Sequence, residues 1–396
     1  MNFTYNQNSG KYILGQTEYT QDEFIAYIQS GLLREALANK SSFDISADQE
    51  DEFDDDDDFI PKHDQIIYYG VPGCGKSNKI KNDLANISEN NVIRVVFHPE
   101  YTNADFVGQI LPVTQGGIHY EFTAGPFSQI LKKAYLNPKQ NFYLVIEEIN
   151  RGNAAAIFGD MFQLLDRLKK DEKNFKVGWS QYFVQNRDVN EYIRKASRTD
   201  YGTFIDSQDD EQPVIAIGNT AFDKDSAIRL PPNLSILATM NTSDQNVFTL
   251  DNAFQRRFDM QLIRNEFETF TNLDQQEVFA SEKIRMQHDA TIGDTEVSWG
   301  KFWKWINKKI TQELKGLSST EDKRLGVWFV CNENGVISTN TFADKVLKYL
   351  WDDAFKFKRN KIFAANIDTL EELVKTFKNA DWNARFDVFS DHSELI

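Results

Sequence analysis

An eight-residue stretch, Gly70-Val-Pro-Gly-Cys-Gly-Lys-Ser77, constrains this chain of 396 residues more than any other feature. It matches the pattern G-x-x-x-x-G-K-[ST] and lies between an apolar, strand-like run, 65–69, and a helix predicted over 76–87. Glycines let successive backbone N–H groups turn inward and form a nest for an anion, and the following helix points the positive end of its dipole at that nest. Strand, loop and helix in this order predict a phosphate-binding unit in an α/β protein.

The residue types in this loop predict the chemistry of its ligand. The candidate binding residues are Gly70, Val71, Pro72, Gly73, Cys74, Gly75, Lys76 and Ser77. Lys76 would supply a point charge for the β- and γ-phosphates of a nucleoside triphosphate, and the Ser77 hydroxyl would be a ligand for Mg²⁺. We expect Cys74 to be a small spacer and not a redox-active thiol.

The rest of the chain predicts an α/β core followed by a mostly helical region. Apolar runs at 92–97, 142–146 and 235–239 predict strands, with helical patterns such as 154–168 between them. This alternation is typical of a parallel sheet with helices on both faces. Beyond residue 266 helical periodicity dominates. Two apolar faces are predicted there: Trp299, Phe302, Trp303, Ile306, Ile310 and Leu314, and Phe342, Val346, Leu347, Leu350, Trp351 and Phe355.

Charge is unevenly distributed along the chain and predicts its division. The chain has 44 basic and 60 acidic residues, a net charge of −16. Nine acids and no base lie within 48–58, and such a block repels itself and is typical of a disordered linker. A helix predicted over 22–39 is too little for a core of its own. We expect an N-terminal segment with an acidic linker (1–58), a nucleotide-binding core (59–265, with an insertion over about 171–212) and a helical C-terminal lid region (266–396).

Composition excludes several classes of protein. The excess of acid argues against a broad basic surface that binds nucleic acid. Two cysteines exclude a disulfide scaffold and a cysteine-rich zinc site. No apolar run reaches about 18 residues, and the first residues lack the basic-then-apolar layout of a secretory signal. We therefore expect a cytoplasmic protein.

A second candidate site lies where the strand predicted over 142–146 ends. Glu147 and Glu148 follow that strand directly. In nucleotide hydrolases the first such acid holds the magnesium ion and the second polarises the attacking water. We assign Glu147 to the metal and Glu148 to the water, noting that the first position is usually occupied by the shorter aspartate.

The strand predicted over 235–239 leads into further candidate residues. Asn241 and Asp244 follow it and could orient the water. We do not interpret this Asn-Thr-x-Asp sequence as a guanine-reading signature, since the tip of a central strand lies near the phosphates. Arg256 and Arg257 come shortly after. Their planar guanidinium groups suit the developing charge on a phosphate and could be presented in trans by a second subunit.

Taken together, these motifs resemble the AAA+ superfamily and, within it, McrB-like GTPase subunits of modification-dependent (McrBC-type) restriction systems. The resemblance covers roughly 59–355. It rests on the loop at 70–77 and on three further motifs, at 148–153, 240–244 and 250–258. Weaker matches lie at 97–101 with 105–106, and at 322–326 with Phe329.

The resemblance implies a ring, usually hexameric, with nucleotide at the subunit interfaces. It implies Arg256 and Arg257 as the arginines acting in trans and Asn241 with Asp244 as the water-orienting pair. GTP and Mg²⁺ are the implied ligands, and an McrC-like nuclease subunit that stimulates hydrolysis and cuts DNA is the implied partner. Only 58 residues precede the core, so recognition of modified cytosine is not carried over, and we expect DNA contact through the complex.

Two alternatives stay open at this point. The same catalytic residues suit an ATP-driven AAA+ remodeller, a MoxR-like chaperone acting on a protein client. A nucleotide switch without hydrolysis is disfavoured by Glu148 and the arginines. The choice of GTP or ATP depends on the atoms at the base, which we expect to be contacted by 59–64. His98 is interpreted either as a residue near the nucleotide or a subunit contact, or as a structural histidine at a strand end.

Overall fold

The computed structural model describes residues 59–114, 118–172, 174–195, 222–241, 248–272, 275–315 and 323–396, and the backbone of short strands within 3–19 and 203–221. The predicted helix over 22–39, the acidic linker and Asp244 lie outside the described residues. The chain forms two compact units. The first unit comprises 1–67, 86–238 and 248–259, and the second comprises 68–85, 239–247 and 260–396.

A five-stranded sheet carries the order β14-β4-β13-β8-β5. Its strands are β14 (Asp259–Leu262), β4 (Gln65–Gly70), β13 (Leu234–Asn241), β8 (Phe142–Glu147) and β5 (Val92–Val96). β8 pairs in parallel with both β13 and β5, and Val96 lies opposite Glu147. Five successive buried residues in β8 reflect a strand covered on both faces. The predicted α/β fold with a parallel sheet is confirmed; the edge strand β14 was not predicted.

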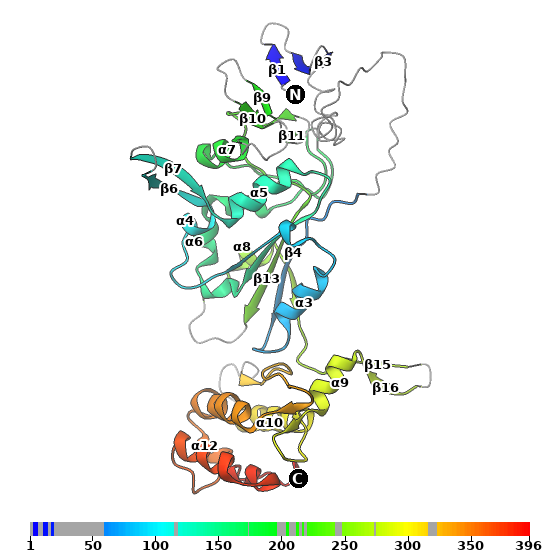
Figure 1. Cartoon of the computed structure of the whole chain (residues 1–396), viewed down its shortest axis with the longest axis vertical. Helices are drawn as coiled ribbons and strands as arrows, with labels where there is room; N and C mark the ends of the chain where they lie inside the picture. Colours follow the sequence, from blue (N-terminus) through cyan, green and yellow to red (C-terminus); the bar gives the residue numbers. More distant parts are fainter. Residues whose placement is uncertain are drawn as a thin grey trace. The chain divides into compact units, whose positions relative to one another are not determined.

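Short helices accompany the sheet in the first unit. They are α4 (Asn103–Phe106), α5 (Pro126–Leu136), α6 (Ala154–Phe158), α7 (Arg187–Arg194) and α8 (Asn252–Gln255), with 3-10 turns at Glu89–Asn91 and Ile149–Arg151. In Figure 1, α5 lies against the sheet, and α7 lies beside α5. Pro126 begins α5, where its missing N–H costs nothing.

The helix predicted over 154–168 is confirmed only in part. The α-helix ends at Phe158, and a 3-10 helix, Gly159–Leu165, continues the chain. Gly159 has a φ of +52°, in the left-handed region that favours glycine. The glycine therefore breaks a helix that the apolar spacing alone made continuous.

Three further β-structures of the first unit were not predicted. β6 (Gly108–Val113) and β7 (His119–Ala124) form an antiparallel hairpin between β5 and α5. A separate sheet has the order β10-β9-β1-β2-β3. Its strands are Glu211–Pro213, Thr203–Ile205, Phe3–Asn6, Lys11–Leu14 and Thr17–Tyr19, and a small ladder joins β11 (Ala216–Ile217) to β12 (Thr220–Ala221). The N-terminal strand β1 thus pairs with a strand of the predicted insertion.

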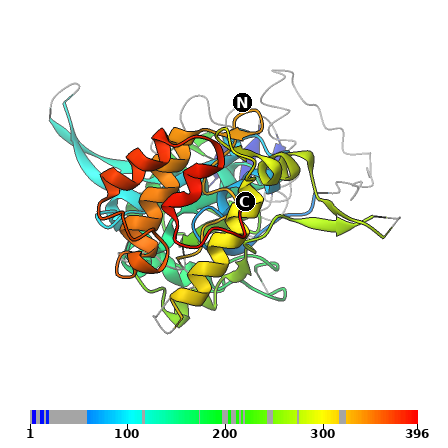
Figure 2. The same cartoon turned by 90° about the horizontal axis from the view of Figure 1, so that it is seen from below.

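The second unit is mostly helical, as predicted (Figure 2). Its α-helices are α3 (Lys76–Asp83), α9 (Glu282–Asp289), α10 (Trp299–Glu313), α11 (Thr339–Thr341) and α12 (Leu370–Asn379). π-helical turns at Phe342–Leu347 and Leu350–Ala354, and 3-10 turns at Arg359–Lys361 and Trp382–Val388, link them. Short strand pairs join β15 (Thr269–Thr271) to β16 (Glu277–Phe279) and β17 (Thr291–Ile292) to β18 (Val336–Ile337).

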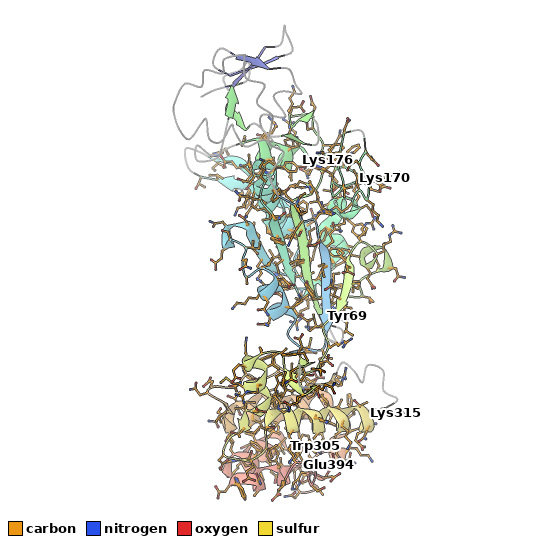
Figure 3. All side chains as sticks on the ribbon, turned by 90° about the vertical axis from the view of Figure 1, so that its right-hand side faces the viewer. Tyr69, Lys170, Lys176, Trp305, Lys315 and Glu394 are labelled. Atoms are coloured by element: carbon orange, nitrogen blue, oxygen red, sulfur yellow. The ribbon has the colours of Figure 1, made fainter. Side chains whose placement is uncertain are left out.

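Both predicted apolar faces contribute to one buried cluster in the second unit. All six residues predicted between Phe342 and Phe355 are buried, while Trp303 is only partly buried. Trp305, labelled in Figure 3, is 4% exposed and joins the cluster although the helical spacing did not predict it. Among the described residues, no helix is both long and apolar enough to cross a lipid bilayer.

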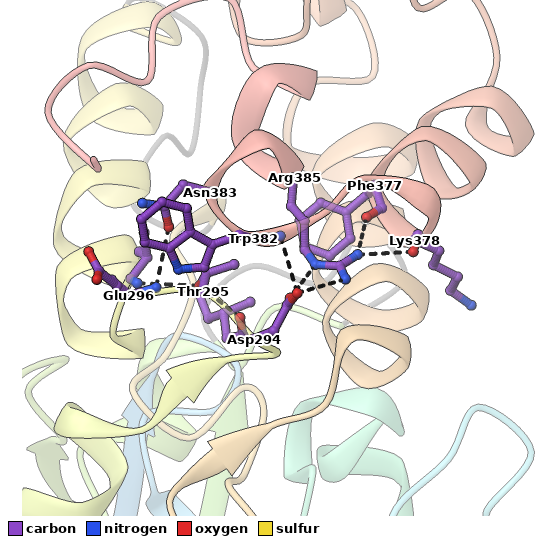
Figure 4. Close-up of polar contacts among 10 residues, drawn as sticks. Asp294, Thr295, Glu296, Phe377, Lys378, Trp382, Asn383 and Arg385 are labelled. Atoms are coloured by element: carbon purple, nitrogen blue, oxygen red, sulfur yellow. Dashed lines mark hydrogen bonds and ion pairs between the residues drawn. The ribbon is translucent and has the colours of Figure 1, made fainter.

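A polar cluster fastens the end of this unit (Figure 4). Arg385 donates from Nε to Asp294 at 2.5 Å and from one terminal nitrogen to the carbonyls of Phe377 and Lys378 at 2.7 and 2.9 Å. The backbone N–H of Trp382 donates to the same carboxylate at 3.1 Å. These bonds, chiefly those from Arg385, lower the pKa of Asp294 to about 2.

Candidate functional site

The candidate phosphate loop connects β4 to α3 in the second unit. Gly73 and Gly75 have φ values of +77° and +105°, in the left-handed region. These values let the loop turn sharply before the helix begins. Lys76 is 7% exposed, and its ammonium group donates to the carbonyls of Gly70 and Val71, both at 3.0 Å. The buried cation is therefore held at the loop itself.

Cys74 packs inside the loop as a spacer. Its side chain is 4% exposed, and its Sγ would lie 2.9 Å from a Cβ placed on Gly70. Burial raises the pKa of the thiol, with Lys76 partly opposing the shift. A thiol held protonated in this way is a poor nucleophile.

A segment far along the sequence, 325–329, packs directly on the loop. The backbone N–H of Gly326 donates to the Pro72 carbonyl at 3.1 Å, and that of Trp328 donates to the Gly73 carbonyl at 2.8 Å. A Cβ on Gly326 would lie 2.1 Å from the Gly73 carbonyl carbon. Only glycine fits at this crossing.

Asn265 fixes the position of this segment. Its side-chain amide donates to the Leu325 carbonyl at 2.9 Å, and its oxygen accepts from the Val327 N–H at 3.2 Å. Sequence reasoning gave 322–329 only as a weak match and missed Asn265. The glycine within a short apolar run was the one local signal for a close backbone contact.

The paired carboxylates lie at the end of β8 in the first unit. The Glu147 side chain is 13% exposed and forms an ion pair with Arg94 on the neighbouring strand β5. The Phe97 N–H donates to the Glu147 carbonyl at 3.0 Å. Sequence reasoning missed Arg94, because the pairing of two strands that lie 53 residues apart is not visible in either strand alone.

Glu148 adopts a strained backbone conformation. Its φ and ψ are 55° and 45°, the left-handed region, which is uncommon for a residue other than glycine. Such a conformation costs about 1–2 kcal/mol and is found more often at functional sites than elsewhere. The side chain is 27% exposed, and its carboxylate lies 3.5 Å from Arg151.

The structure describes only one of the two candidate residues at the end of β13. Asn241 is the last residue of β13, is 7% exposed and belongs to the second unit. Asp244 lies outside the described residues. His98 is exposed at the end of β5, and its ring contacts Tyr101 edge-on at 5.3 Å.

The two candidate arginines have different environments in the first unit. Arg256 is exposed. The Arg257 side chain is 10% exposed, donates to Asp166 at 2.6 Å and to the Ala253 carbonyl at 2.9 Å, and lies 4.1 Å above the Phe162 ring. Adjacent arginines therefore split into one solvated and one anchored side chain.

The segment 59–64, predicted to contact the base, lies at the amino end of β4, away from the phosphate loop. This segment precedes β4, whereas the phosphate loop follows it, and a strand of six residues spans roughly 20 Å. The Asp64 N–H donates to the Ser235 hydroxyl at 3.0 Å, at the amino end of β13. The segment instead lines a cavity of about 540 Å³ with Tyr135 and Trp179.

Comparison with known proteins identifies the family. A family model described as "AAA domain (dynein-related subfamily)" matches residues 65–258. The type II restriction enzyme BsuMI component YdiS of Bacillus subtilis is 32% identical over 356 residues, covering 83% of this chain and 90% of that protein. The type IV methyl-directed restriction enzyme EcoKMcrB subunit of Escherichia coli is 25% identical over 209 residues, covering 52% of this chain and 36% of the relative.

A solved ATPase structure from Cytophaga hutchinsonii aligns with 73% of this chain and 71% of its own at 15% identity, with a TM-score of 0.26. The predicted resemblance is confirmed by the two restriction-enzyme relatives and by the matching domain model. From its sequence relationship to these proteins and its parallel-sheet core, the chain belongs to the McrB-like AAA+ family of nucleoside triphosphatases.

Proposed function

We propose that this protein is the GTP-hydrolysing motor subunit of a McrBC-type restriction complex that defends the cell against foreign DNA. In this proposal copies of the chain form a ring, which we take to be a hexamer, and an McrC-like nuclease subunit stimulates hydrolysis and cuts the DNA. The names of the two restriction-enzyme relatives favour this role over an ATP-driven remodeller of protein clients. We place the complex in the cytoplasm, where free thiols such as those of Cys74 and Cys331 stay reduced.

The buried ammonium group of Lys76 carries the proposal. It now donates to neutral carbonyls of its own loop. An ionised phosphate oxygen attracts an ammonium group more strongly than a neutral carbonyl oxygen does, because both partners then carry a charge. Phosphate oxygens would therefore replace the carbonyls as acceptors, and the loop N–H groups would hold the same phosphates.

Ser77 and Glu147 are the residues that would hold Mg²⁺. A hydroxyl and a carboxylate are the oxygen ligands that this ion prefers, so the donor set fits. When bound, the ion supplies positive charge to the oxygens of the transferred phosphate. Arg94 currently shares the Glu147 carboxylate, so the ion pair competes with metal binding.

Glu148 is the proposed general base. Its backbone leaves the extended conformation of β8 and enters the left-handed region directly after the strand ends. It would accept a proton from the attacking water as the water oxygen bonds to the γ-phosphorus and the bond to the β-γ bridging oxygen breaks. Asn241 and Asp244 would orient that water.

Arg256 is the proposed arginine acting in trans. Its exposed side chain can reach a site on an adjoining copy, while the bonds of Arg257 to Asp166 and Ala253 hold the turn that presents it. Removing such an arginine typically costs 10³–10⁵ in turnover. A site completed by a neighbour makes turnover per subunit rise steeply with protein concentration.

Phosphate release by purified protein tests the proposal. We expect GTP turnover above ATP turnover, stimulation by the nuclease partner with DNA, and a steep dependence on protein concentration. Lys76→Ala should abolish nucleotide binding, and Glu148→Gln should keep binding but stop turnover. Turnover by Lys76→Ala at the wild-type rate, or constant specific activity down to high dilution, would contradict the proposal.

A further inference from the structure

A cavity of about 510 Å³ extends from the phosphate loop along α3, entirely within the second unit. One wall is a single helical face, because Gly75, Asn78, Lys79 and Asn82 are spaced at i, i+3, i+4 and i+7. At 1.5 Å per residue this wall is roughly 10 Å long. That length is comparable with the reach of a nucleoside from its phosphate.

An aromatic side chain, Trp328, lines the cavity next to the loop. A Cβ placed on Gly75 would lie 3.3 Å from the Cδ1 atom of Trp328. The Lys283 ammonium lies 5.3 Å from the centre of the indole ring. Bases stack on such rings irrespective of their identity, because each has a π-face.

Two carboxylates supply hydrogen-bond acceptors to the lining of the cavity. Glu266 and Glu268 line it and are exposed, while the residue between them, Phe267, packs on Trp303 at 5.3 Å. Asn265 binds the backbone of residues 325 and 327. These bonds fix the segment that carries Glu266 and Glu268 relative to the segment that carries Trp328. The same cavity is lined by three cationic side chains, those of Lys79, Arg264 and Lys283. Their positive charge offsets the repulsion that the two carboxylates would exert on an anionic ligand.

We propose that this cavity takes the ribose and base of the nucleotide whose phosphates the loop binds, that the base stacks on Trp328, and that Glu266 and Glu268 select guanine. The inference rests on the proposed function. Guanine presents N–H donors at N1 and N2, which carboxylates accept. Adenine presents an acceptor at N1, which the same carboxylates would repel. The segment 262–268 thus replaces 59–64 as the expected base-reading part.

Calorimetric titration of the full chain with GDP, IDP and ADP tests the inference without requiring hydrolysis. Trp328→Ala should raise the Kd for GDP roughly 5- to 150-fold, the usual loss for a stacking ring, while Trp328→Phe should retain most of the affinity. Trp382→Ala, which removes an indole that is 51% exposed and does not line the cavity, is the matched control and should bind as wild type.

The carboxylates are tested by base choice. Wild type should bind GDP more tightly than ADP, with IDP between them because it lacks the N2 donor. Combined Glu266→Gln and Glu268→Gln should lower the preference for GDP over ADP about tenfold, the discrimination expected of a paired contact. Combined Glu371→Gln and Glu372→Gln on α12, which removes the same number of charges away from the cavity, serves as the control and should leave that preference unchanged.

The outcomes separate the two proposals. If wild type binds neither GDP nor ADP, the proposed function fails. If it binds GDP in a manner that Lys76→Ala abolishes, yet Trp328→Ala binds as wild type while unfolding at a wild-type temperature, the base cavity is wrong. If the ring substitution weakens binding but the double glutamine variant keeps the base preference, selection by the carboxylates is overturned.

Discussion

Replacing Gly326 by alanine should damage nucleotide binding more than it damages folding. The added Cβ would lie 2.1 Å from the Gly73 carbonyl carbon and 2.4 Å from the carbonyl oxygens of Gly73 and Pro72. All three atoms belong to backbone, so no side chain can rotate away. The loop and the segment 325–329 must therefore separate.

The size of the effect follows from the bonds at this crossing. Separation breaks two backbone hydrogen bonds, from Gly326 to Pro72 and from Trp328 to Gly73, each worth about 0.5–1.5 kcal/mol. The total of about 1–3 kcal/mol corresponds to a loss of roughly 5- to 150-fold in GDP affinity. The overpacked Cβ should destabilise the folded protein by a similar free energy and so lower its melting temperature by a few degrees.

Gly335→Ala is the matched control. Gly335 lies in the same unit with a φ of +82°, and a Cβ there would meet nothing within 4 Å. Alanine in a left-handed conformation costs about 1–2 kcal/mol, so this variant should lose similar stability but keep its affinity for GDP. Calorimetric titration and thermal unfolding of both variants decide the matter. Equal GDP affinity in Gly326→Ala and Gly335→Ala would refute the reasoning.

Three further outcomes are expected. Because the folded-state pKa of Asp294 is lowered to about 2, its contribution is present above about pH 4 and is lost as the pH falls from 4 to 2. Asp294→Asn should cost on the order of 1 kcal/mol at pH 7, discounted because the side chain is 51% exposed, and its thermal unfolding should approach that of wild type near pH 2. A difference in melting temperature between Asp294→Asn and wild type that does not narrow as the pH falls would contradict this expectation. Arg94→Met should free the Glu147 carboxylate and lower the Mg²⁺ concentration for half-maximal turnover. A higher Mg²⁺ requirement in this variant would contradict the proposed competition between Arg94 and the metal ion for Glu147. Arg257→Ala should lower the melting temperature by several degrees through loss of its bond to Asp166, whereas Arg256→Ala should melt as wild type and lose turnover.

The local sequence was sufficient to predict the elements whose identity depends on neighbouring residues. The loop at 70–77 and the strands around it carry their signal in glycine, lysine and β-branched residues within a few positions. β14 has no such signal: Asp259–Leu262 becomes a strand because it pairs at the edge of a sheet that already exists. The hairpin of β6 and β7 was likewise missed.

The parts of the site that sequence could not predict depend on contacts between distant segments. Gly326 and Trp328 bind the loop from about 250 residues away, and Asn265, which holds their segment in place, lies about 60 residues before them. Nothing in the pair Arg256-Arg257 distinguishes the exposed side chain from the one held by Asp166. The expectation for 59–64 was based on its nearness to the loop in sequence, although β4 separates the two segments in space.

The central claim, that a neighbouring copy completes each nucleotide site, is tested most directly by mixing two inactive variants. Glu148→Gln keeps Arg256, and Arg256→Ala keeps Glu148, so a mixed ring holds sites in which both residues are intact. With equal amounts and random assembly, about a quarter of the interfaces should regain GTP turnover. Restored turnover on mixing is the predicted result; a mixture no more active than its separate components, under conditions where both assemble, would contradict the claim.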